Sequence, residues 1–232
     1  MGKPVSPPQS KGPPPHPVIA VISDLVASRK LTGPDRGEVQ TELRKFLAQL
    51  NKRYRRALLS NFVITIGDEF QALLRDPEVI PDLAWELDGK LAGVEVRIGV
   101  GFGKIYTPLR PTAIGMDGPA FHNARDAINS AAKEGWLGGV FLGFSRPGDQ
   151  ILNGFARALQ RHRAGMTDRQ REVAALLRSG KTNKQVAETL GITKQAVGDH
   201  VKTMGWEEYS LTEVGWRAAL GVFSGTSEVK PA

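Results

Sequence analysis

The sequence predicts an α+β fold followed by a small all-α unit. Two observations carry this prediction. Apolar runs of strand length, such as Val18–Ser23, Asn61–Ile66 and Phe70–Leu74, alternate with segments whose apolar residues recur every three or four positions. After Gly165 the strand-like runs stop, and short amphipathic segments with helix-capping residues take their place. The 232 residues suffice for one sizeable domain or two small ones.

Each element of the α+β part has a local signal. Helices are expected after Gly33, after Asp76 and from about Pro119 to Lys133, and strands over Val94–Phe102 and Gly139–Phe144. The resulting order is β-α-β-β-α-β-α-β, which is the ferredoxin-like arrangement with an extension. This arrangement leaves a sheet with helices on one face. Because many unrelated functions use this fold, it decides little about activity.

The composition excludes several classes of protein. There is no cysteine, so disulfides and thiolate metal sites are absent. No apolar run approaches the roughly 20 residues that span a bilayer. The first 17 residues are rich in Pro and lack the apolar centre of a secretory signal, so we expect a disordered lead-in. These features favour a soluble, cytoplasmic protein that contacts no membrane.

The all-α part has the features of a helix-turn-helix unit. Thr167 and Thr182 each begin a capping box, Gly191 permits a left-handed turn, and Thr193 caps a third helix. A short extended piece is expected over Trp206–Ser210, before a closing helix. The predicted domain boundaries are a lead-in over 1–17, an α+β domain over 18–148, a connecting helix over 149–165, the helix-turn-helix domain over 166–222 and a tail over 223–232.

Charge along the chain favours a nucleic-acid partner for the helix-turn-helix. Residues 151–204 carry ten Lys and Arg against four acids, so they hold +6 of the total net charge of +7. A basic segment on a nearly neutral body indicates a polyanion. We expect groove-reading side chains on the third helix and phosphate contacts at the helix ends. The expected DNA-binding residues are Lys181, Lys184, Lys194, Gln195 and Lys202. The alternative is a helical unit that contacts protein.

Three carboxylates stand at the ends of predicted strands. Asp24 follows the run Val18–Ser23, and Asp68 and Glu69 follow Gly67 at the tip of a predicted hairpin. If the two strands are neighbours, Asp24 and Asp68 meet at one edge of the sheet. Paired acids there can hold Mg²⁺ against the phosphates of a nucleotide. The alternative is structural, because Asp often caps helices and Gly-Asp often turns hairpins.

Several motifs resemble known families. Ile22–Val26 is similar to the first metal-aspartate strand of class III nucleotidyl cyclases, and Thr65–Phe70 to their hairpin and to the signature of GGDEF-type diguanylate cyclases. Val96–Gly103 and Gly118–Arg125 resemble the cyclase strand and helix entry that follow. Thr167–Val173 and Ile192–Val197 resemble LuxR-type regulators and the fourth region of sigma factors. The whole chain is identified as a member of the SatD family, which combines both parts.

The cyclase resemblance implies roles for individual residues. Asp24 and Asp68 would be the ligands of Mg²⁺ or Mn²⁺, and in an enzyme they would be catalytic together with Arg125. The backbone leading to Arg29 and Lys30 could reach phosphates. The expected ligand-binding residues are Gly67, Glu69, Arg97 and Arg125.

Two departures from the cyclase pattern favour binding over turnover. Ile64 stands where ATP-using cyclases carry a lysine, and isoleucine cannot read a base edge. The transition-state pair of cyclases is an Asn and an Arg four residues apart, whereas Asn123 and Arg125 are two apart. At helical pitch these two side chains point about 200° from each other, so we expect one of them to lie outside the site.

Three functional hypotheses follow. The first is a DNA-binding transcriptional regulator whose cyclase-like domain binds a nucleotide or another phosphate ligand, or mediates dimerisation. The second is a Mg²⁺- or Mn²⁺-dependent nucleotidyl cyclase or nucleotidyltransferase that acts on a nucleoside triphosphate. The third is a protein-interaction module. The resemblance also implies a homodimer, because cyclase-like domains build their sites between two chains.

Overall fold

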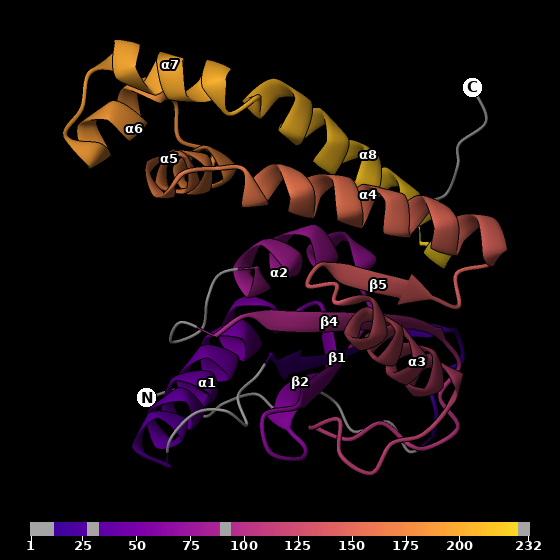
Figure 1. Ribbon diagram of the computed structural model, residues 1–232. Coiled ribbons are helices and arrows are strands. Elements are labelled where there is room, and N and C mark those ends of the chain that lie inside the picture. Colours follow the sequence, from indigo (N-terminus) through magenta and orange to yellow (C-terminus); the bar gives the residue numbers. More distant parts are fainter. Residues whose placement is uncertain (1–11, 27–32, 89–93, 227–232) are drawn as a thin grey trace.

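A five-stranded sheet forms the centre of the molecule, with strand order β2-β3-β1-β4-β5 (Figure 1). The computed structural model describes residues 12–26, 33–88 and 94–226, so most of the predicted lead-in and part of the predicted tail lie outside it. The strands are β1 (Val18–Leu25), β2 (Leu58–Ile64), β3 (Phe70–Leu74), β4 (Val96–Gly103) and β5 (Gly139–Leu142).

The topology confirms the ferredoxin-like prediction. β1 lies between β3 and β4 and is antiparallel to both, and β2 is antiparallel to β3. These four strands with their two connecting helices form the βαββαβ unit. β5 extends the sheet by pairing parallel to β4, with a crossover helix between them. The fold is therefore an α+β sheet with the predicted extension.

Helices cover both faces of the sheet, so the prediction of helices on one face is wrong. α1 (Gly33–Arg53) and α2 (Ile80–Leu87) share one core with Val21 of β1, whereas α3 (Pro119–Glu134) shares a second core with Ile22. Successive residues of a strand point to opposite faces. Because the apolar run of β1 is unbroken rather than alternating, both of its faces need a cover.

Close packing of α3 against β4 depends on glycines. Gly99, Gly101 and Gly103 lie on the face of β4 under α3, and a Cβ at Gly101 would lie 2.1 Å from the carbonyl oxygen of Ala120. Only a chain without a side chain there lets the helix approach so near. The glycine series in the sequence therefore marks the place where α3 packs on β4.

Five helices follow the sheet. α8 returns alongside α4, with the ring of Phe155 against Gly215 (Figure 1). The expected extended piece over Trp206–Ser210 is wrong, because this segment is the first part of α8. No helix in the described residues is long and apolar enough to cross a membrane. The helices are α4 (Arg146–Ala164), α5 (Asp168–Arg178), α6 (Asn183–Leu190), α7 (Lys194–Thr203) and α8 (Trp206–Ser224).

The C-terminal helices share their core with the sheet, so the prediction of a separate all-α domain is wrong. Trp216 of α8 packs on Phe141 of β5, with ring centroids 5.6 Å apart. Tyr209 packs on Trp85 of α2, at 5.9 Å. Capping boxes do begin α5 and α6 as predicted, but α8 closes on the sheet domain rather than on these helices alone.

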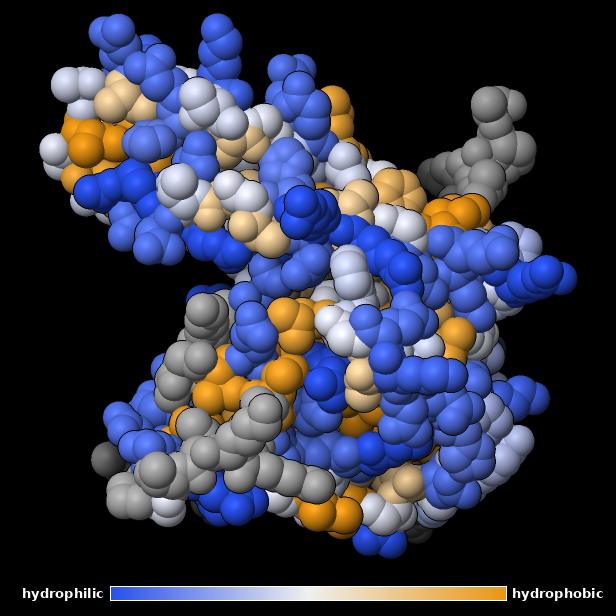
Figure 2. All heavy atoms as spheres, viewed as in Figure 1, coloured by the Kyte–Doolittle hydropathy of each residue, from blue (hydrophilic) through white to orange (hydrophobic). Residues whose placement is uncertain are grey.

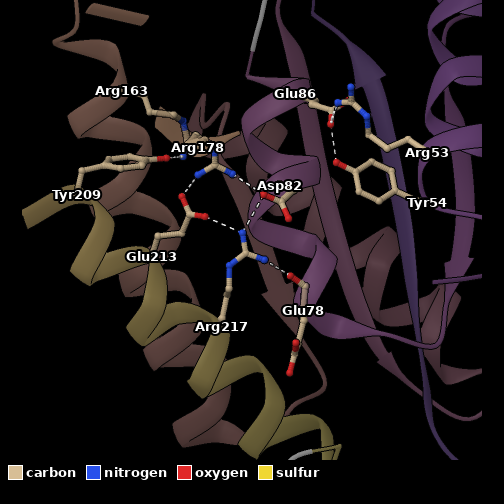
Figure 3. A network of polar contacts seen from close by, with 10 residues as sticks. All are labelled: Arg53, Tyr54, Glu78, Asp82, Glu86, Arg163, Arg178, Tyr209, Glu213 and Arg217. Carbon is tan, nitrogen blue, oxygen red and sulfur yellow. Dashed lines mark hydrogen bonds and ion pairs between the residues drawn. The ribbon is translucent and has the colours of Figure 1, made fainter. Parts of the chain in front are cut away.

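A network of ion pairs joins the same layers (Figure 3). Arg178 of α5 pairs with Asp82 of α2 at 2.6 Å and with Glu213 of α8. Arg217 of α8 pairs with the same two acids, at 2.8 and 2.7 Å. Arg163 of α4, almost fully buried, pairs with Asp88 at 2.8 Å. These contacts fix the C-terminal helices to α2 and the residue that follows it.

Candidate functional site

The strand register brings the predicted acids together. Ser23 of β1 pairs with Phe70 of β3, so Asp24 lies beside the tip of the β2–β3 hairpin. Gly67 adopts φ +64° at this tip, a left-handed conformation that favours glycine. Burial raises the pKa of Asp24, and the nearby charges of Asp68 and Glu69 raise it further, against the lowering effect of Arg97. One edge of the sheet thus carries three acids.

Asp24 is held by a neighbouring strand but is only half satisfied. Arg97 stands opposite it in the β1–β4 register, and its Nη1 donates to Oδ2 of Asp24 at 3.1 Å. Oδ1 of Asp24 is buried and has no hydrogen-bond partner, and neither has Nε of Arg97. A buried carboxylate oxygen without a partner is costly unless a donor or a cation meets it.

Glu69 is fully engaged. Arg125 of α3 donates to both of its carboxylate oxygens, with Nη2 2.7 Å from Oε1. The hydroxyl of Thr65 donates to the same Oε1 at 2.9 Å. The hydrogen bonds from Arg125 hold the pKa of Glu69 below its usual range. The hairpin tip is therefore tied to α3.

Two contacts at the tip have no signal in the sequence. Gln40 of α1 donates from Nε2 to the carbonyl oxygen of Gly67 at 2.7 Å, across 27 residues of chain. Thr65 supports Glu69 from the other side of the turn. Neither a helical glutamine nor a strand-end threonine forms a recognisable pattern, so only the structure reveals them. They fix the turn that carries Asp68.

Asn123 and Arg125 point in different directions, as their spacing predicts. Asn123 donates from Nδ2 to the carbonyl oxygen of Phe102 at 2.8 Å, whereas Arg125 reaches Glu69. Ile64, at the end of β2, offers no polar group. The segment with Arg29 and Lys30 lies outside the described residues. The roles predicted for the site residues stay predictions.

The donor set is compatible with a divalent cation but incomplete. No group of three or more His, Cys, Asp or Glu among the described residues is placed to hold a metal ion. The unpartnered Oδ1 of Asp24 is an acceptor that Mg²⁺ or Mn²⁺ would satisfy. Asp68 lies close enough to raise the pKa of Asp24. Asp24 and Asp68 are therefore the acids that an ion could use here, because Arg125 occupies both carboxylate oxygens of Glu69.

A cavity of about 560 Å³ does not coincide with the carboxylate site. It lies beside α4 and α5, with Asp88, Gln160 and Arg171 among its lining residues. None of the predicted site residues lines it. The carboxylate site lies instead at an edge of the sheet between the hairpin tip and α3, where the Asp24 side chain is 30% exposed.

The predicted DNA-binding residues lie at the other end of the molecule. α6 and α7 project away from the β2–β3 hairpin (Figure 1), and the surface of this part is mostly hydrophilic in Figure 2. Four of the five side chains are exposed and that of Lys181 is half-buried. The predicted residues are Lys181, Lys184, Lys194, Gln195 and Lys202.

A protein-family model matches most of this chain. The model of the SatD family matches residues 18–213, from β1 into α8. The chain belongs to the SatD family. One family model thus spans the sheet and the C-terminal helices together, which agrees with their common core. No curated protein has a sequence that matches this chain.

Nucleotide cyclases are among the solved structures that match this chain. A bacterial light-regulated adenylyl cyclase is 17% identical at a TM-score of 0.41, over 56% of this chain and 44% of its own. The guanylate cyclase domain of RhGC from Catenaria anguillulae, in complex with GTP, is 16% identical at 0.39, over 50% and 73%. A monomeric guanylyl cyclase domain of the RhoGC fusion protein from the aquatic fungus Blastocladiella emersonii is 18% identical at 0.40, over 53% and 79%. The chain thus spans less than half of the adenylyl cyclase.

These findings contradict the prediction of a DNA-binding transcriptional regulator. The family match does not show the predicted helix-turn-helix domain, and the C-terminal helices share one core with the sheet. The charge count over 151–204 misled because it omitted acids that fold against this segment. Arg163 and Arg178 pair with Asp88 and Asp82, and Arg157 pairs with Glu134. Much of the basic charge thus serves packing within the chain.

Proposed function

We propose that this SatD-family chain is a nucleotidyl cyclase-like protein that binds a nucleoside triphosphate together with Mg²⁺ or Mn²⁺. The observation that carries the proposal is the buried, unpartnered Oδ1 of Asp24 beside Asp68 and Glu69. Three acids against Arg97 and Arg125 leave an excess of negative charge. Such an edge favours a cation, and the bound cation in turn favours a polyphosphate.

Each residue has a part in this proposal. Asp24 and Asp68 would hold the ion, which when bound neutralises phosphate charge and can activate a hydroxyl group. Arg97 orients Asp24 through the hydrogen bond to Oδ2. Arg125 supplies a guanidinium for the phosphates. Gly67 leaves the turn without a side chain, so a ligand can approach the backbone.

The site favours binding over fast turnover. Asn123 is committed to the backbone of Phe102, so its amide is not directed at the acids. Ile64 has no group that distinguishes adenine from guanine, so we expect ATP and GTP to bind with similar affinity. Any turnover would be cyclisation or nucleotidyl transfer with release of pyrophosphate. The homodimer implied by the resemblance remains a prediction.

Calorimetric titration tests this function. ATP and GTP are titrated into the protein with Mg²⁺, with Mn²⁺ and with EDTA, and pyrophosphate release is followed in parallel. Asp24→Asn and Asp68→Asn should each abolish the metal-dependent part of the binding. Asp126→Asn, which removes an exposed acid next to Arg125 on α3, is the matched control and should bind normally. If the unaltered protein binds neither nucleotide with either metal, the proposal is wrong.

A further inference from the structure

The Glu69–Arg125 ion pair lies beside Asp24, whose pKa it influences from both sides: Glu69 raises it and Arg125 lowers it. Glu69 stands on the hairpin tip and Arg125 on α3, and the pair is bidentate. The Arg125 side chain is 44% exposed and the Glu69 side chain 18% exposed. Arg125 is thus the more exposed member of the pair, and Glu69 is the more buried one.

The Glu69–Arg125 pair disfavours binding of a divalent cation without a triphosphate, and binding of a triphosphate without a cation. A divalent cation near Asp24 would be repelled by Arg125, whose charge acts on Asp24. It would also lack Glu69, whose two oxygens are occupied. A triphosphate would be repelled by Glu69 and would have to take Arg125 from it. When both ligands come together, the phosphates can pair with Arg125 and the cation with Glu69.

We propose that the Glu69–Arg125 ion pair is a latch that makes binding of the cation and of the triphosphate mutually dependent. The latch rests on the proposed function and adds its regulation. With both ligands bound, Arg125 would pair with phosphate oxygens instead of Glu69, and the released Glu69 carboxylate would help Asp24 and Asp68 to hold the cation. Each ligand thereby removes the obstacle to the other, which is positive coupling between two parts of one site.

The structure limits the latch to side-chain movement. α3 is seated on the glycines of β4, where a Cβ at Gly101 would already overlap the helix backbone. Gln40 holds the carbonyl of Gly67 from α1, so the hairpin tip is also fixed. Arg125 and Glu69 are the long, flexible groups between these fixed parts. Their exchange needs rotations about side-chain bonds and no displacement of the helix.

Two variants open the latch from opposite sides. Arg125→Gln removes the guanidinium and frees Glu69, and Glu69→Gln removes the carboxylate and frees Arg125. Glu134→Gln is the matched control, because it breaks an exposed ion pair of 2.6 Å with Arg157 at the far end of α3. Binding of Mn²⁺ alone is followed by the electron paramagnetic resonance of the free ion. Binding of ATP in EDTA is followed by calorimetry.

The expected pattern is reciprocal. Arg125→Gln should bind Mn²⁺ alone about fivefold or more tightly than the unaltered protein, and Glu69→Gln should bind ATP in EDTA tighter by a similar factor. In both variants the factor by which each ligand strengthens binding of the other should fall towards one. Glu134→Gln should match the unaltered protein in every titration.

The outcomes separate the latch from the proposed function. If the unaltered protein binds ATP with Mg²⁺ but Arg125→Gln and Glu69→Gln change neither single-ligand affinity, the latch is overturned and the function stands. If the unaltered protein binds no nucleotide, the proposed function fails. The Mn²⁺ titration of Arg125→Gln then still decides whether Arg125 guards the acids. Arg125→Lys, which keeps the charge but not the bidentate geometry, should give an intermediate Mn²⁺ affinity.

Discussion

Two clusters of acids and arginines in this molecule use the same chemistry for different ends. At the α2–α8 contact, Asp82 and Glu213 meet Arg178 and Arg217 in a network with equal numbers of each charge (Figure 3). At the hairpin tip three acids meet two arginines. The oxygen Oδ1 of Asp24 is left there without a partner.

The difference shows how a structural ion-pair network can be told from a binding site. A balanced network with paired atoms satisfies itself and holds helices together, and adding a ligand would break contacts. An unbalanced cluster with an orphaned oxygen has a use for a cation. Charge balance and unsatisfied atoms therefore distinguish the two clusters better than the residue types, which are the same in both.

The largest expected effect concerns the packing of α3, the helix that carries Arg125 of the hairpin-tip cluster. Gly101→Ala places a Cβ 2.1 Å from backbone atoms of Ala120 and Ala124, under the helix that carries Arg125. We expect a loss of more than about 4 kcal/mol of unfolding free energy, or failure to fold. Denaturant titration measures it. Gly154→Ala, in α4 with nothing within 4 Å, is the control and should stabilise by about 0.5–1 kcal/mol. Equal stability of the two variants would refute the claim that α3 packs on β4 only because residue 101 has no side chain.

Substitutions in the balanced network at the α2–α8 contact should lower the unfolding free energy strongly and leave nucleotide affinity unchanged. Glu213→Gln leaves the largely buried Arg178 short of a counter-charge, so we expect a loss of about 3 kcal/mol. Glu172→Gln, which breaks an exposed pair with Arg169, should cost less than about 1 kcal/mol. Thermal and urea unfolding measure both. Nucleotide affinity of folded Glu213→Gln should be unchanged, and a large change would show that the two clusters are coupled.

The smallest effect on stability, with the largest on binding, is expected at Asp24. Asp24→Asn should alter the unfolding free energy by less than about 1 kcal/mol, because the folded protein already disfavours this charge. The folded pKa of Asp24 lies above its ordinary value of 3.8. The unaltered protein should therefore lose stability relative to Asp24→Asn as the pH rises above that value. Unfolding curves from pH 3 to pH 7, taken at roughly one-unit steps, check the sign. A variant that is much less stable at neutral pH would make Asp24 structural.

Local patterns predicted the sheet and most of its connections. The apolar runs of β1 and β3 placed the acids at strand ends, because strand periodicity is a local property. That Asp24 lies near the hairpin tip depended on the pairing of β1 with β3, which the structure supplies. The same patterns could not show that α3 covers the second face. That depends on where a crossover connection passes, and only the unbroken apolar run of β1 hints at it.

Contacts between residues far apart in the chain could not be predicted from the sequence. Arg163 and Arg178 looked like part of a basic surface because their partners, Asp88 and Asp82, are 75 and 96 residues away. Trp206–Ser210 looked extended because aromatic residues favour strands, whereas packing of Tyr209 on Trp85 holds it in a helix. Charge counted along a segment says little until its partners in space are known.

The return of α8 to the sheet has a consequence for how the protein is made. Trp216 and Leu220 complete the core beside β5, so this part of the core stays incomplete on the ribosome until α8 emerges. Phe141 of β5 and Trp85 of α2, which contact Trp216 and Tyr209 of α8, would be exposed to chaperones in that interval. Folding of the nascent chain should be late and cooperative rather than domain by domain.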